Sequence, residues 1–134
     1  MGKFILTITL LLSVWGFSPP ATINGKWKVG EVQVSAITEK ATPKQKAMLV
    51  AQTKKMFIGQ IFDFRDGQAF SMSPGMPTMP GNLTWSYNAS TGILLITEAN
   101  DPRSRIFDMA ASEQDGKVIF TIRDAPIALT MHRL

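Results

Sequence analysis

The feature that most constrains the fold of this chain is a regular succession of short segments, from Gly25 to Leu134, in which apolar and polar residues alternate. A two-residue period is typical of β-strands with one buried face. Turn signals rich in Gly, Asn, Asp and Pro separate the segments, and one helical insertion follows the first. The sequence therefore predicts an all-β, eight-stranded antiparallel up-and-down barrel with one α-helix between strands 1 and 2, a fold without free edges. The expected strands cover 26–34, 60–64, 68–71, 81–88, 93–97, 105–110, 117–123 and 127–132.

The N-terminal residues are typical of a signal peptide. Lys3 supplies a short positive region, and the apolar run Phe4–Trp15 follows it. This run is too short to span about 30 Å of hydrocarbon, which favours cleavage over a retained membrane anchor. We expect residues 1–21 to be the signal peptide and 22–134 to be one domain, with no stable membrane span after cleavage. The small residues at which a signal peptidase would cut are Gly16, Ser18 and Ala21.

Composition narrows the class of protein further. The chain has no cysteine, so disulfides, thiolate metal sites and cysteine nucleophiles are excluded, and a bacterial export route is favoured. We expect a periplasmic or extracellular location. The net charge is +4, or +3 without Lys3. No basic run interleaves with aromatic residues, so we expect no nucleic-acid partner. The oligomeric state stays open.

Helix signals follow the first strand. Thr42 is typical of an N-cap, Pro43 suits the first helical position, and Gln45 completes a capping box. We expect the helix to run to about Ile58 and to end at Gly59.

The predicted helix has an apolar stripe and several lysines. The stripe predicts packing against one end or side of the barrel; it consists of Leu49, Val50, Thr53, Met56 and Phe57. The lysines are typical of a solvated helix face, which we favour, and the alternative is contact with an anionic surface. They are Lys44, Lys46, Lys54 and Lys55.

The length of the hairpin loop in the segment 60–71 can be predicted from the requirement that apolar side chains of both strands lie on the same face. A three-residue loop at 65–67 places Phe64 opposite Gln68 and Phe62 opposite Phe70, so that all the aromatic residues share one face.

Two other local features can be predicted in the same way. The buried face of the first strand changes near Gly30, which indicates a bulge or bend. A two-residue turn at Asp115-Gly116 places Met109 opposite Ile122, so that apolar residues face each other.

The order of several short motifs resembles that of the bacterial lipocalin-like domains, small exported proteins common in Bacteroidetes. The motifs are Gly25-Lys26-Trp27 before a helix, then Phe62, Phe64, Asp66, Gly67 and Phe70, then Gly81-x3-Trp85-x-Tyr87. The resemblance covers nearly all of the chain after the signal peptide, and it implies a lipocalin- or calycin-like, non-catalytic barrel. It also implies that Trp27 closes one barrel end and that Arg133 on the last strand packs against its indole, a cation–π contact worth about 1 kcal/mol or more when desolvated.

An aromatic interior is the expected ligand site. Aromatic walls suit a small apolar or amphipathic ligand, and Tyr87 and Gln68 are the candidates for orienting its polar end. The alternative is that the rings pack on one another and fill the barrel. The expected lining residues are Phe62, Phe64, Phe70, Trp85, Tyr87, Phe107 and Phe120.

A loop rich in Met and Pro follows the hairpin at 72–81. Met72, Met76 and Met79 are soft thioether ligands that suit Cu(I), and His132 or Met131 would add a fourth ligand if the fold brought them near. The favoured alternative is a barrel-mouth loop that covers apolar surface.

The sequence contains no catalytic motif. His132 is the single histidine, and the nucleophile, phosphate-loop and dinucleotide signatures are missing. We therefore predict an exported, non-catalytic protein without cofactor that binds a small ligand inside its barrel, with the helix and the 72–81 loop controlling access. A solid barrel that acts as an envelope interaction protein is the second hypothesis, and a Cu(I)-handling protein is the third.

Overall fold

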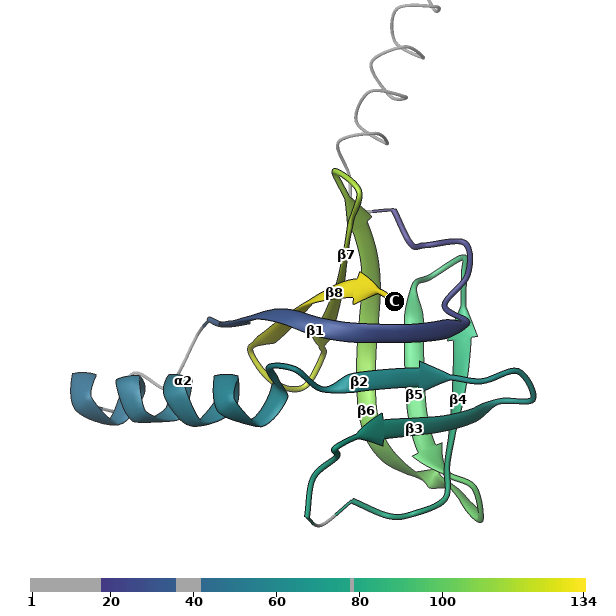
Figure 1. The fold of residues 1–134 in the computed structure, drawn as a ribbon, viewed down its shortest axis with the longest axis horizontal. Helices are drawn as coiled ribbons and strands as arrows, with labels where there is room; N and C mark the ends of the chain where they lie inside the picture. The colour runs from purple at the N-terminus through teal and green to yellow at the C-terminus, as the bar shows by residue number, and fades with distance from the viewer. Residues whose placement is uncertain (1–17, 36–41, 78) are drawn as a thin grey trace, which may run out of the picture.

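The computed structural model describes residues 18–35, 42–77 and 79–134. In these residues eight antiparallel strands, paired in sequence order, form a closed barrel, and β1 pairs with β8 to complete it (Figure 1). The predicted up-and-down barrel with one helix between its first two strands is confirmed. The elements are β1 (Gly25–Val34), α2 (Pro43–Phe57), β2 (Ile61–Phe64), β3 (Ala69–Ser73), β4 (Leu83–Asn88), β5 (Ile93–Glu98), β6 (Asp101–Gln114), β7 (Lys117–Ile122) and β8 (Ile127–Arg133).

The predicted bulge in β1 is confirmed. Val29 pairs with Met131 and Glu31 pairs with Thr130, so the register shifts across Gly30. The buried face accordingly passes from Val29 to Val32. This glycine also has a packing role, because the imidazole of His132 occupies the space that a Gly30 side chain would need.

The two hairpin predictions had different outcomes. The Asp115-Gly116 turn places Met109 opposite Ile122, as predicted, with both turn residues at positive φ. The β2–β3 register was predicted wrongly. Phe64 lies opposite Phe70, not Gln68, and Phe62 lies opposite Met72.

The error in β2–β3 comes from the loop conformation. Gly67 and Gln68 both have positive φ, at 82° and 72°, and the Arg65 amide donates to the Ala69 carbonyl at 2.9 Å. The loop is therefore centred one residue later than predicted. The resulting slip moves each partner by two residues, which leaves every side chain on its predicted face.

The ends of α2 match the prediction. The Thr42 hydroxyl accepts from the Gln45 amide at 3.1 Å, and the Gln45 side chain accepts from the Thr42 amide at 2.9 Å. This reciprocal capping box satisfies two backbone donors that the first turn would leave unpaired. Gly59 follows the helix at a φ of 82°.

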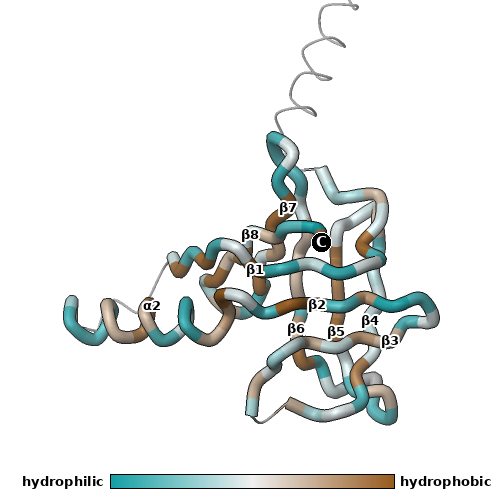
Figure 2. Tube along the Cα trace, in the orientation of Figure 1, coloured by the Kyte–Doolittle hydropathy of each residue, from teal (hydrophilic) through white to brown (hydrophobic). Residues whose placement is uncertain are grey.

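The predicted packing of the helix against the barrel is confirmed for only part of the stripe: the ring centroid of Phe57 lies 6.3 Å from that of Phe107, and Val50 lies beside Val32 and Val34 of β1. Among the residues of α2, all of which the structure describes, only Phe57 is buried, while Leu49 is 45% and Met56 48% exposed. Leu49 and Met56 lie about 80–100° around the helix axis from Phe57, so the predicted stripe spans two faces. Figures 1 and 2 show α2 extending beyond the barrel, near the end of β1.

One end of the barrel is crossed by residues 18–24. Ile23 is fully buried, Pro20 is buried, and Ser18 forms a β-bridge with Glu113 of β6. The Trp27 indole donates to the Ile23 carbonyl at 2.8 Å. These contacts attach the segment to the barrel. In the described part of the chain, no helix combines the length and apolar character needed to cross a bilayer.

Candidate binding site

The predicted aromatic residues form a packed cluster inside the barrel. Six of the eight predicted ligand-binding residues contact one another, with ring centroids 5.1–6.4 Å apart; they are Phe62, Phe64, Phe70, Trp85, Phe107 and Phe120. These are ordinary distances for packed aromatic pairs. Phe62 and Phe120 are fully buried, and Phe64 is 1% exposed. The rings therefore fill the space that the sequence assigns to a ligand.

The two predicted polar anchors lie elsewhere. Gln68 is exposed in the β2–β3 turn, and its carbonyl accepts from the Trp85 amide at 2.9 Å. The Tyr87 hydroxyl donates to the Pro20 carbonyl. Burial, and then the negative charge of Glu113, raise the pKa of Tyr87. Tyr87 thus ties β4 to the N-terminal segment instead of turning its hydroxyl toward the rings.

Trp27 and Arg133 stack at the barrel end that the N-terminal segment crosses. The Arg133 guanidinium carbon lies 4.1 Å from the centroid of the indole, which confirms the predicted contact. The same guanidinium donates to the Asn24 carbonyl at 2.8 Å. Gly25 has a φ of 113°, a conformation that favours glycine, and carries the chain past the guanidinium. The pair therefore joins the first and last strands to residues 22–24.

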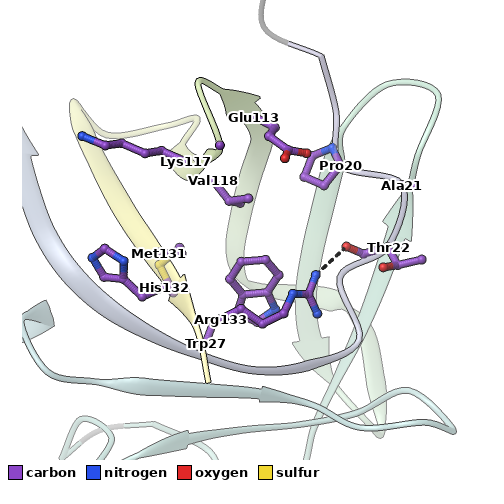
Figure 3. A pocket seen from close by; sticks show the side chains of 11 residues that line it. Pro20, Ala21, Thr22, Trp27, Glu113, Lys117, Val118, Met131, His132 and Arg133 are labelled. Atoms are coloured by element: carbon purple, nitrogen blue, oxygen red, sulfur yellow. Dashed lines mark hydrogen bonds between the residues drawn. The ribbon is translucent and has the colours of Figure 1, made fainter.

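A pocket of about 470 Å³ lies beside this pair (Figure 3). We call it the end pocket. Its apolar part is made by Trp27, Val118 and Met131, and residues 20–22 form one side. Figure 3 shows Glu113 and Arg133 beside this apolar part, whereas the side chains of Lys117 and His132, which also line the pocket, extend away from it.

Sequence reasoning missed the end pocket for a physical reason. The pocket lies outside the aromatic interior, and one of its sides is a segment that the sequence assigns in part to the signal peptide. One sequence feature could have indicated a polar site at this barrel end. It is the placing of basic residues next to each other at the chain end, His132 and Arg133, and of Lys117 just after a turn.

The methionine loop forms a separate surface. Met72, Met76 and Met79 line one hollow of about 210 Å³, with Phe70 and Leu83. Met76 and Met79 also line a neighbouring hollow of about 290 Å³ beside Phe107. The loop therefore brings the three predicted thioethers to one place. Met131 and His132, the proposed fourth ligands, line the end pocket and not these hollows.

Gln60 holds this loop, a role that no sequence pattern indicates. Its side chain is 5% exposed. The amide nitrogen donates to the carbonyls of Met56 and Gly75 at 3.1 and 3.2 Å, and the amide oxygen accepts from the Gly75 amide at 2.9 Å. One buried amide thus connects the end of α2 to the start of the methionine loop.

Titratable side chains do not converge on a metal site in the described ranges, where no three His, Asp or Glu residues form such a group. Comparison of the chain with protein-family models, curated proteins and solved structures finds no match.

Proposed function

We propose that this chain is an exported, non-catalytic binding protein that holds a small amphipathic molecule in the end pocket. The observation that carries the proposal is the contrast between the packed aromatic interior and the pocket of about 470 Å³ outside it. That volume falls in the range of sites for small molecules. The family resemblance and the leader sequence support the same class of protein.

The chemistry of the pocket supports an amphipathic ligand with an anionic group. Its apolar part would rest on Val118 and Met131, where burial of apolar surface favours binding. Among the lining residues, Lys117 and Arg133 carry positive charge and Glu113 carries negative charge, and this balance favours negative charge at the polar end of the ligand.

Native mass spectrometry of the protein purified from its own host, followed by organic extraction, tests the proposal. We expect one bound amphipathic molecule per chain. Lys117→Glu should lower the affinity for the extracted molecule about tenfold, because it reverses one charge at the pocket. Arg103→Glu is the matched control, since Arg103 is exposed in β6 and does not line the pocket.

Two results would contradict the proposal. One is a clean unliganded mass with no change in tryptophan fluorescence against a panel of anionic amphiphiles. The other is an equal loss of affinity in both variants. Either result would favour the hypothesis of a solid barrel that acts through its outer surface.

Cu(I) handling is a second candidate function, and the shared hollow of Met72, Met76 and Met79 favours it. Thioethers are soft ligands for Cu(I). In a competition titration with a Cu(I) chelator, Met76→Leu/Met79→Leu should abolish binding. Met48→Leu/Met56→Leu on α2 removes two exposed methionines elsewhere and should leave binding unchanged. Equal Cu(I) affinity of all three proteins would exclude the methionine loop as a copper site.

A further inference from the structure

Helix α2 carries an exposed, uncharged stripe on the side turned away from the barrel. Met48, Leu49 and Met56 are 53%, 45% and 48% exposed. With Gln45 and Gln52 they fall within an arc of about 100° at 100° per residue. The barrel side of the helix is a different face. Phe57 is buried there, and Val50 lies beside Val32 and Val34 of β1.

Every formal charge on this helix is positive. The segment 42–58 contains four lysines and no acidic residue. Lys44 and Lys55 lie along one border of the stripe, and Lys46 lies toward the other. The β1 residues that line the hollow beside Val50 and Lys54 are uncharged. The apolar stripe is thus bordered by cations that have no acidic partner within the helix.

We propose that α2 is a peripheral membrane-docking helix that lies on a surface of anionic phospholipid. In such a helix the apolar side enters the boundary between headgroups and acyl chains while flanking lysines reach the phosphates. Each lysine near an anionic surface adds attraction, so Lys44, Lys46 and Lys55 compensate for a modest apolar stripe, while Lys54 lies on the side of Val50. Docking of this kind concerns a different face from the end pocket and is independent of the proposed ligand.

Charge and composition favour a lipid surface over the other possible occupants. In a symmetric dimer through this stripe, the lysines of one copy would face the lysines of the other, which is unfavourable. Protein interfaces concentrate their binding energy in Trp, Tyr and Arg, and α2 contains none of these. Its cations are flexible, point-like lysines, which match mobile phosphate headgroups better than a fixed acidic groove.

The position of the helix allows this docking. Because only Phe57 of its residues is buried, the stripe is exposed along the whole helix. Figure 1 shows α2 extending away from the barrel, so a flat surface can reach its outer side.

Vesicle flotation with the protein as isolated from its host tests the proposal. We compare vesicles of phosphatidylcholine alone with vesicles that also contain phosphatidylglycerol. We expect binding to the anionic vesicles only, with an affinity that falls as salt is added. Lys44→Gln/Lys55→Gln should weaken this binding about tenfold or more. Leu49→Ser/Met56→Ser should also weaken it about tenfold without changing the net charge.

The control variant is Lys26→Gln/Arg103→Gln, which removes two exposed charges outside α2 and outside the end pocket. It should bind the anionic vesicles like the parent protein. An equal loss in this control would show that net charge and not the helix governs binding, and would overturn the proposal. Equal affinity for both kinds of vesicle, or no vesicle binding, would also overturn it. If self-association in ultracentrifugation then depended on Leu49 and Met56, the stripe would belong to a second copy. The ligand extraction described above is unaffected by these outcomes, so the two proposals fail separately.

Discussion

The barrel interior and helix α2 both carry apolar residues at the spacing of their secondary structure, yet their environments differ. Phe62 in β2 is fully buried and contacts four other rings. Leu49 in α2 is 45% exposed. A strand in a closed barrel has neighbours on both edges and opposite walls across the interior, whereas α2 contacts the barrel with one side, at β1 and at Phe107 of β6.

This difference shows what an apolar pattern specifies. Periodicity identifies which side chains share a face, and the fold decides whether that face meets another part of the chain. An apolar face that no part of the chain covers indicates a binding partner outside the chain. The following mutations test this contrast.

The largest effect should come from the centre of the aromatic cluster. Phe62→Ala removes a fully buried ring that contacts Phe64, Phe70, Phe107 and Phe120, and should lower the free energy of unfolding by about 3–5 kcal/mol. Urea denaturation followed by tryptophan fluorescence measures this change. A loss below about 1 kcal/mol would mean that the interior is loosely packed, and would restore the hypothesis of a ligand among the rings.

The next effect concerns the N-terminal segment. A chain that starts at Thr22 should unfold about 2–3 kcal/mol more easily than one that starts at Ser18. The shorter chain loses buried Pro20, the bond from the Tyr87 hydroxyl, and the bond from the Glu113 amide to Ser18 at 2.8 Å.

Thermal denaturation of the two chains measures the contribution of this segment. Equal stability would show that residues 18–21 add nothing to the fold, and that the end pocket forms without one of its sides. N-terminal sequencing of the protein purified from its host then tells which of the two forms exists.

Local rules predicted most of the fold. The bulge at Gly30, the Asp115-Gly116 turn and the Thr42 capping box each depend on a few adjacent residues, so the sequence was sufficient. The predicted β2–β3 register was wrong because Gly67 and Gln68 both adopt positive φ. Glycine commonly adopts this conformation, but glutamine does not, so the sequence did not indicate it.

The candidate site depended on long-range arrangement and was harder to predict. Residues 20–22 and Lys117 are distant in sequence and meet only because β6 and β7 extend beside the N-terminal segment. The aromatic residues were assigned to the correct face, but alternation alone does not distinguish rings that line a cavity from rings that fill it. The same limit applies to α2, where the pattern did not reveal that two different faces are apolar.

A smaller effect is expected at the start of α2. Thr42→Ala removes one half of the capping box and should cost the helix about 1 kcal/mol. Because α2 buries only Phe57, this loss should appear as faster amide hydrogen exchange in the first turns of the helix, with the melting temperature of the barrel unchanged. A fall in the barrel's melting temperature comparable to that of Phe62→Ala would show that helix and barrel unfold as one unit.

The smallest effect should be on the exposed stripe itself. Leu49→Ala should change the free energy of unfolding by less than about 0.5 kcal/mol, since its side chain is already 45% exposed and alanine favours the helix. Phe57→Ala, on the buried face of the same helix, is the matched comparison and should cost about 3 kcal/mol or more.

Chemical denaturation of the Leu49→Ala and Phe57→Ala variants measures this difference in the free energy of unfolding. A cost for Leu49→Ala as large as that for Phe57→Ala would mean that the stripe is covered by the chain in solution, which would remove the basis for docking. A near-zero cost combined with weaker vesicle binding would separate the two faces of α2, one that supports the fold and one available to a membrane.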